Sequence, residues 1–241
     1  MKDVLGTAIS DYYHNASTGK LWVHNKYGPK EEMPVDVYFR DMEEMPELEW
    51  AALHQCRGKI LDIGAGAGSH ALALQKMGLD ITALDISPQS VAVMRARGVK
   101  KVIEKDFFQL SPGQNPGLDP GPQENTYDTL LLLMNGIGLA GTLTGLSEFF
   151  AKARTLLQPG GQLVFDSSDI AYLYDGKPPE SPEYYGEVLY QYEYRRERSD
   201  WFKWLFIDRR TLTRIAAREG WQTEVIFEDP WEQYLVRCRP Q

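Results

Sequence analysis

The 241-residue sequence has few cysteines and no long apolar run. Its two cysteines, Cys56 and Cys238, lie far apart and match no CxxC or zinc-ligand spacing, so we expect a reducing compartment and no structural metal. No apolar run approaches the roughly 20 residues that a membrane-spanning helix needs, and the first 15 residues lack the apolar core of a secretory signal. The sequence therefore predicts a cytoplasmic protein that does not enter a membrane.

Positive charge is also in deficit, since the formal net charge is −8 at pH 7. A negative protein repels a phosphate backbone, so a nucleic-acid partner is disfavoured. One basic segment, residues 195–218, runs against this trend, and three of its arginines recur every four residues on one side of a predicted helix: Arg210, Arg214 and Arg218. We interpret them as a solvated helix face; a contact with RNA or with a protein substrate is the alternative.

Between residues 59 and 167, short apolar segments alternate with amphipathic ones, which is typical of βαβ units on a parallel sheet. Strands are predicted over 59–63, 80–84, 101–104, 127–135 and 162–166, and helices over 69–77, 88–97 and 142–157. The segment 111–126 is dense in proline and glycine and predicts an exposed loop, and Pro-Gly-Gly at 159–161 predicts a turn before the last of these strands.

Two regions fall outside this alternation. Residues 1–45, which precede a predicted helix over 46–56, are aromatic and polar, and we expect them to form a cap or lid. Residues 168–206 contain β-forming residues on both sides of Ser199-Asp200, which predicts a hairpin inserted as a second cap. The chain closes with a predicted helix over 208–219 and two strands over 221–228 and 232–238.

These elements predict an α/β fold with a Rossmann-like, doubly wound sheet of seven strands, mostly parallel and with an antiparallel last strand. The predicted domain covers residues 46–241 and carries the cap insertion at about 168–206. An antiparallel pair at the end of such a sheet is unusual for a dinucleotide dehydrogenase.

The segment LDIGAGAGSHALAL (61–74) places glycines at 64, 66 and 68 between the first strand and a helix. Glycines permit positive φ and let backbone amides approach a ligand closely. The helix N-terminus that follows presents unpaired N–H groups and a partial positive charge, which suit a carboxylate or phosphate. A tight turn, a dinucleotide site and an S-adenosylmethionine (SAM) site all use such a segment, so the motif alone leaves these alternatives open.

Two acids follow the next two strands. Asp85 lies 21 positions after Gly64, where a carboxylate accepts hydrogen bonds from both hydroxyls of a ribose. NAD and SAM sites share this feature, so it indicates a nucleoside cofactor without choosing between them. Asp106, just beyond the third strand, is placed to accept a hydrogen bond from the exocyclic amine of adenine while Phe107 packs nearby. The alternative is that Asp106 is an ordinary solvated acid in a loop.

Taken in order, the segments DIGAGAG, ALDISP, EKDFF, YDTLLLLMNGIG and LLQPGGQLVFD resemble the class I SAM-dependent methyltransferases over about residues 46–167. The resemblance implies methyl transfer from SAM to a small-molecule acceptor, with the glycine turn beneath the methionine part of SAM, Asp62 organising that end, and the ribose, the adenine and the sulfonium held in turn along the strand ends. The implied cofactor residues are Asp62, Gly64, Ala65, Gly66, Gly68, Asp85, Ile86, Asp106, Phe107, Met134, Asn135 and Gly136.

The sequence departs from some branches of that family, because the Asn-Pro-Pro-aromatic tetrapeptide of many amino-group methyltransferases is absent where MNGIG follows the fourth strand. No residue is assigned as catalytic, since each histidine is more simply a packing or surface residue. The acceptor, the atom methylated and the oligomeric state are not indicated.

Three other functions remain open at this point. In an NAD-dependent oxidoreductase the third glycine of GxGxxG would fall at Ser69, and no second mononucleotide-binding half follows. A non-catalytic SAM-binding or interaction module would keep the same cofactor residues. A methyltransferase acting on RNA or protein would use the basic segment.

Overall fold

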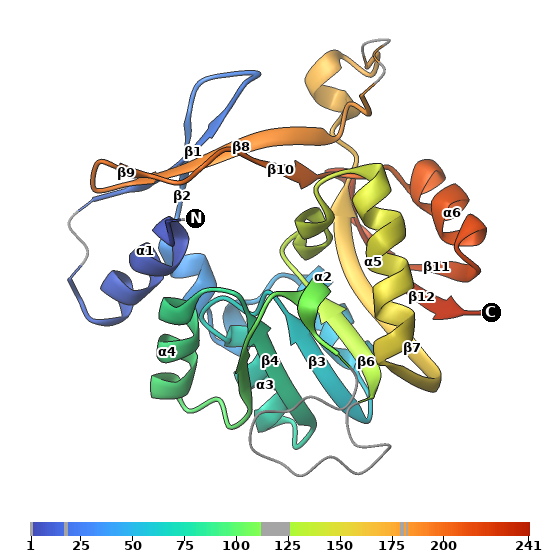
Figure 1. Ribbon diagram of the computed structural model, residues 1–241, viewed down its shortest axis with the longest axis horizontal. Helices are drawn as coiled ribbons and strands as arrows, with labels where there is room; N and C mark the ends of the chain where they lie inside the picture. The colour runs from blue at the N-terminus through green and yellow to red at the C-terminus, as the bar shows by residue number, and fades with distance from the viewer. Residues whose placement is uncertain (1, 17–18, 112–125, 179–180, 182) are drawn as a thin grey trace.

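Seven strands form the larger of two sheets in the computed structural model, which describes residues 2–16, 19–111, 126–178, 181 and 183–241 (Figure 1). The strand order is β11-β12-β7-β6-β3-β4-β5. Strands β3 to β7 pair in parallel, whereas β12 is antiparallel to both β7 and β11. The bounds are β3 (Lys59–Ile63), β4 (Asp80–Asp85), β5 (Val102–Glu104), β6 (Tyr127–Leu132), β7 (Leu157–Ser168), β11 (Trp221–Glu228) and β12 (Gln233–Pro240). The predicted fold class is confirmed, while the predicted loop at 111–126 lies almost wholly outside the described residues.

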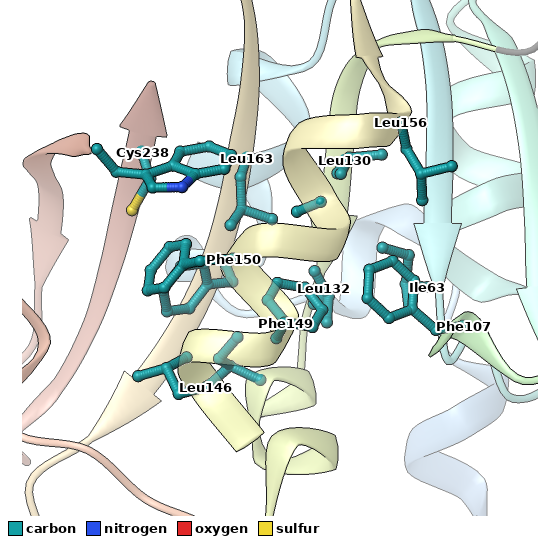
Figure 2. Packing of buried hydrophobic residues seen from close by; sticks show 14 of the residues in the cluster. Ile63, Phe107, Leu130, Leu132, Leu146, Phe149, Phe150, Leu156, Leu163 and Cys238 are labelled. Atoms are coloured by element: carbon teal, nitrogen blue, oxygen red, sulfur yellow. The ribbon is translucent and has the colours of Figure 1, made fainter. Parts of the chain in front are cut away.

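Helices cover both faces of this sheet. Along β3, Ile60 faces one hydrophobic cluster and Leu61 faces another, as expected of a strand buried on both sides. The cluster around Leu61 includes residues of α5 and α6, and Figure 2 shows Phe149 and Phe150 of α5 packed within it. The other cluster includes residues of α2, α3 and α4. These helices are α2 (Glu47–Gln55), α3 (Ser69–Lys76), α4 (Pro88–Arg97), α5 (Leu143–Leu156) and α6 (Arg209–Arg218).

The arginine face of α6 is solvated, as we interpreted it from the sequence. Arg210, Arg214 and Arg218 are exposed, whereas Leu212 and Ile215 on the other side of the helix are buried. Nowhere in the described part of the chain is there a helix with the length and apolar character to cross a membrane.

The two predicted caps form one sheet. Strand β1 from the N-terminal segment pairs with β8 from the insertion, in antiparallel register from Trp22↔Glu193 to Asn25↔Tyr190. The order is β10-β8-β1-β2, with β9 also paired to β8, and Figure 1 shows this cap sheet crossing the molecule apart from the larger sheet. Its strands are β1 (Leu21–Asn25), β2 (Glu31–Met33), β8 (Glu187–Tyr194), β9 (Glu197–Arg198) and β10 (Phe202–Leu205).

The hairpin turn in the insertion is not where the sequence pattern placed it. Strand β8 turns into β9 at Arg195-Arg196, whose φ angles are 51° and 74°, and Ser199-Asp200 instead separates β9 from β10. A two-residue hairpin turn of type I′ needs positive φ at both positions, which is usually signalled by Asn-Gly or Asp-Gly. Here two arginines adopt it, and Arg195 is held by an ion pair of 2.8 Å to Asp11 of helix α1 (Val4–Tyr13), so the turn depends on a tertiary contact.

Two strand boundaries also differ from the prediction. Strand β7 begins at Leu157 and contains Pro-Gly-Gly as a bulge, since the pairing steps from Tyr127↔Leu157 to Thr129↔Gln162, five residues on β7 against two on β6. Gly160 permits this with a φ of 77°. Strand β6 ends at Leu132, rather than at residue 135, because the chain turns through left-handed conformations just beyond it.

Candidate functional site

The glycine turn between β3 and α3 adopts the backbone that its sequence predicts. Gly64, Gly66 and Gly68 have φ angles of 72°, 56° and 83°, and the amides of Gly64 and Ala65 both donate to the carbonyl of Leu84 on β4. The glycines have different reasons to lack a side chain. A Cβ on Gly68 would lie 2.9 Å from side-chain atoms of α4 and the residues after it, whereas no described residue beyond the chain neighbours comes within 4 Å of that position on Gly64. Open space at Gly64 leaves room for a ligand to approach the backbone.

Asp85 ends β4 directly beside this turn. Its Oδ2 accepts a hydrogen bond of 2.8 Å from the amide of Gly66, and its Oδ1 accepts one of 2.8 Å from the amide of Ser87. Burial raises the pKa of Asp85 to about 6, although these two amides lower it. The structure thus brings together the glycine turn and the carboxylate that the sequence paired. The next residue, Ile86, is 67% exposed, which is unusual for a large apolar side chain beside a candidate ligand site.

Helix α1 approaches the same carboxylate from the N-terminal segment. Ser87 Oγ donates a hydrogen bond of 2.6 Å to Asp3 Oδ2, and Asp3 is the N-cap of α1. Gly6 makes the approach possible, because a Cβ there would lie 2.1 Å from Ser87 Oγ. The N-terminal helix is therefore joined to the end of β4 through one serine.

Asp62 lies on β3 below the turn and is almost fully buried, at 2% exposure. Its Oδ2 has no hydrogen-bond partner among the described residues. Burial raises the pKa of Asp62 to about 6, with a lowering contribution from the nearby His70. A buried carboxylate oxygen without a partner is costly, so this atom is suited to a cationic ligand group.

Asp106 and Phe107 follow β5, at the start of the 3-10 turn η3 (Phe107–Gln109). Asp106 Oδ1 accepts a hydrogen bond of 2.9 Å from the amide of Phe108 and so caps the turn. Phe107 points into the core, where its ring stacks on Phe149 at 4.6 Å, and Figure 2 shows it among the buried side chains. The more exposed ring beside Asp106 belongs to Phe108, which the sequence reasoning did not select.

Met134 and Asn135 turn the chain after β6 with φ angles of 60° and 53°, before the 3-10 turn η4 (Gly136–Ala140). Asn135 is buried, and its amide donates to both oxygens of Asp166, at 3.0 and 2.9 Å. Its side chain accepts from Ser167 Oγ at 3.0 Å. Asn135 therefore fixes the turn, while Met134 and Gly136 are only partly buried. Asp166 was missed by the sequence reasoning, although an acid at the end of the fifth strand was a readable signal.

Tyr38, on the 3-10 turn η1 (Val35–Phe39), covers the glycine turn from the N-terminal segment. Its ring carbon Cδ1 would lie 3.1 Å from a Cβ on Gly66. Two side chains hold this arrangement: Ser69 Oγ donates to the carbonyl of Tyr38 at 2.7 Å, and Arg97 donates to the carbonyl of Ala67 at 2.7 Å and to that of Phe39 at 3.3 Å. Burial, followed by the charge of Asp85, raises the pKa of Tyr38 well above its ordinary value, so its hydroxyl stays protonated.

The four histidines do not converge at the strand ends. His14 and His54 are exposed, and each bonds through Nδ1 to the carbonyl four residues earlier at 2.8 Å. His24 lies 2.9 Å from Glu193 on the cap sheet. Only His70 is buried. Among the described residues, no three His, Cys, Asp or Glu side chains are arranged to hold a metal ion.

The site offers four chemical features within a short stretch of sheet edge: an acid for a diol, a buried acid for a cation, open space beside the backbone of Gly64, and exposed apolar side chains. These features fit a nucleoside that carries an amino-acid end. They require no acid or base placed at a reacting atom.

Comparisons with known proteins find methyltransferases. Residues 60–161 match the family described as a methyltransferase domain. The crystal structure of a SAM-dependent methyltransferase from Bacteroides fragilis in complex with S-adenosyl-L-homocysteine is 40% identical to this chain, covers 99% of it and 95% of that chain, and superposes with a TM-score of 0.87.

More distant proteins share the fold. The CcbJ methyltransferase from Streptomyces caelestis is 15% identical with a TM-score of 0.65, over 98% of both chains. A demethylmenaquinone methyltransferase from Tropheryma whipplei is 27% identical over 44% of this chain and 40% of that protein. The chain spans about half the length of the curated relatives it matches. The match to a Geobacillus protein, the first of these relatives, covers 53% of that protein.

Proposed function

Because the chain belongs to the class I SAM-dependent methyltransferases, we propose that it transfers the methyl group of SAM to a small-molecule acceptor. The observation that carries the proposal is Asp85, whose two oxygens lie against the glycine turn at 2.8 Å from the amides of Gly66 and Ser87. A carboxylate fixed in this way is ready to accept hydrogen bonds from both hydroxyls of a ribose. The open space at Gly64 admits the rest of the cofactor.

We assign the cofactor contacts as follows from the geometry. Gly64, Ala65, Gly66 and Gly68 pass beneath the methionine end, and Asp62 faces its ammonium group. Asp85 holds the ribose, and Ile86 and Asp106 flank the adenine. Phe107 packs in the core behind the adenine subsite, and the exposed Phe108 supplies the aromatic ring that contacts the adenine. Met134 and Gly136 lie near the sulfonium, with Asn135 holding their backbone.

When bound, SAM supplies a methyl group on a sulfonium, so a nucleophilic atom of the acceptor bonds to that carbon as the carbon–sulfur bond breaks. The chain's contribution is to orient the reactants and exclude water. Holding them in line lowers the activation barrier by on the order of 7–11 kcal/mol. For this reason we assign no catalytic acid or base.

The acceptor is proposed to be a small molecule bound under the cap. A net charge of −8 opposes a nucleic-acid acceptor, and the arginine face of α6 is simply exposed to solvent. Relatives named for demethylmenaquinone and for ubiquinone biosynthesis support a small-molecule acceptor. Two free cysteines, both buried, are consistent with the cytoplasm as the location.

Calorimetric titration with SAM and with NADH, followed by acceptor screening, tests the proposal. We expect saturable binding of SAM and none of NADH. We also expect S-adenosylhomocysteine to be released only when an acceptor, for example a substituted hydroquinone, is present. Lack of SAM binding would refute the cofactor assignment, and binding without turnover across a broad acceptor panel would favour a non-catalytic module.

The domain boundaries support a cap over the acceptor. We propose that residues 1–45 and the insertion at about 168–206 act together, since β1 and β8 are paired. Phe202 lies opposite Tyr190, so their side chains share one face of the cap sheet. Tyr192 and Phe202 have ring centroids 5.2 Å apart, and a Cβ on Gly138 of η4 would lie 2.1 Å from the Trp204 indole. This face therefore meets the segment that follows β6.

Replacing Tyr192 by alanine tests whether this face of the cap sheet binds the acceptor. We expect kcat/KM for the acceptor to fall about 10-fold, which corresponds to about 1.4 kcal/mol of lost aromatic contact, while the Kd for SAM changes less than threefold. Trp201→Ala is the matched control, because Trp201 lies on the same insertion and is exposed. An equal loss of acceptor use and SAM affinity in Tyr192→Ala would contradict a role in acceptor binding.

A further inference from the structure

A buried ion network lies beneath the glycine turn. Glu49 of α2 is 5% exposed, and its two oxygens meet two different basic side chains. Oε2 is 2.8 Å from His70 Nε2 on α3, and Oε1 pairs with the guanidinium of Arg40 from the N-terminal segment. Three separate segments of the chain therefore converge on one carboxylate. Sequence reasoning gave none of these residues a role.

Asp62 is close enough to the His70 imidazole for their charges to interact. The charge of Asp62 acts on the imidazole, and the imidazole acts on Asp62 in return. Three other groups interact electrostatically with this pair. The charge of Asp85 raises the pKa of Asp62, and Asp62 in turn raises the pKa of the Cys56 thiol. The charge of Arg40 lowers the pKa of His70. His70 is the cation among them that lowers the pKa of Asp62, and Asp62 Oδ2 is the oxygen without a partner in the described chain.

We propose that His70 is a positioning residue for the cofactor: its imidazolium, anchored by Glu49, keeps Asp62 ionised beneath the glycine turn, where Asp62 binds the ammonium group of the methionine end of SAM. This inference rests on the proposed function, and it names the group that makes the ammonium subsite work. Arg40 completes the network by holding the second oxygen of Glu49.

The direction of the electrostatic effects follows from burial and charge. Burial by itself would lower the pKa of His70, but the hydrogen bond to Glu49 and the charge of Asp62 raise it, and the net shift is upward. The imidazolium therefore persists to a higher pH than in an isolated histidine. It opposes the upward effect of burial on Asp62, whose pKa is about 6. Without this positive charge, Asp62 would ionise only at a higher pH.

His70→Gln tests the inference by calorimetric titration of SAM from pH 6 to pH 9. With the pKa of Asp62 moved from about 6 to about 7, we expect the variant to bind SAM about fivefold more weakly than the wild type at pH 6 and about twofold more weakly at pH 7. The difference should shrink toward pH 9, so the midpoint of the pH profile moves up by about one unit, since one pKa unit corresponds to a tenfold change. Glu49→Gln, which frees the imidazole from its anchor, should shift the profile in the same direction.

5′-Methylthioadenosine is the matched ligand control, because it keeps the ribose and adenine but has no ammonium group. Its affinity should be the same in wild type and in both variants. An unshifted pH profile for SAM, or an equal loss of affinity for 5′-methylthioadenosine, would overturn the role of His70 and indicate packing damage instead. Failure of the wild type to bind SAM would instead refute the proposed function, so the two results are distinguishable.

Discussion

Replacing Asp85 by alanine should weaken SAM binding about 100-fold in calorimetric titration. The expected loss is about 3 kcal/mol, because two hydrogen bonds from ribose hydroxyls to a charged acceptor are removed at about 1.5 kcal/mol each. Asp85 also accepts from the amides of Gly66 and Ser87, so the variant loses part of the support for the glycine turn. Both effects weaken binding of any ligand that carries a ribose.

Asp80→Ala is the control, since Asp80 begins the same strand and pairs at the surface with Lys101. Its SAM affinity should match the wild type. Asp85→Asn keeps one acceptor oxygen and should bind SAM with intermediate affinity. Wild-type affinity in Asp85→Ala would exclude the ribose role and, with it, the placement of the cofactor.

The pH dependence of SAM binding should follow the same carboxylates. Asp62 and Asp85 both have pKa values raised to about 6 by burial. Protonation weakens the hydrogen bonds that they accept from hydroxyls and removes the charge that pairs with a cation, so wild-type affinity should fall as the pH is lowered through 6. Binding of SAM that is constant from pH 8 to pH 5 would contradict this assignment.

The glycine turn and Asp85 could be predicted from the sequence because their relation is local. A strand, a glycine-rich turn and a helix determine where Gly64 lies, and the next strand of a βαβ unit pairs alongside, which places Asp85 at the same edge. The fold class was predictable for the same reason, since apolar strands that alternate with amphipathic helices indicate a mostly parallel sheet. The strand order was not predicted, because β6 lies beside β3 and β12 lies between β7 and β11, and neither neighbour follows from a short connection.

The N-terminal residues and the cap sheet that cover the site could not be predicted in this way. Tyr38 reaches Gly66 only because Ser69 and Arg97 bind carbonyl groups of the N-terminal segment, and no spacing in the sequence reports these contacts. The choice between Phe107 and Phe108 depends on the direction of side chains in a single 3-10 turn, where adjacent residues point differently. Pairing of β1 with β8, more than 160 residues later, is likewise a tertiary event.

Asp62→Asn should separate stability from binding, because the two effects have opposite signs. The folded-state pKa of Asp62, about 6, lies above the ordinary value of 3.8. The folded protein therefore holds this proton more tightly than the unfolded chain, and the contribution of Asp62 to stability is greatest below pH 4 and is lost as the pH rises through 6. Above that pH the protein carries a buried charge with an unpartnered oxygen, and a neutral amide relieves part of this cost.

At pH 8 we expect the ligand-free Asp62→Asn protein to be more stable by about 1 kcal/mol, which raises Tm by about 3 °C for a chain of this size. The gain should shrink as the pH is lowered from 8 toward 4. The same variant should bind SAM at least 10-fold more weakly, since the amide cannot pair with an ammonium group, and added SAM should therefore raise its Tm less than that of the wild type. Scanning calorimetry with and without SAM measures both effects, and a variant that is destabilised at pH 8 yet binds SAM normally would show that Asp62 serves the fold rather than the cofactor.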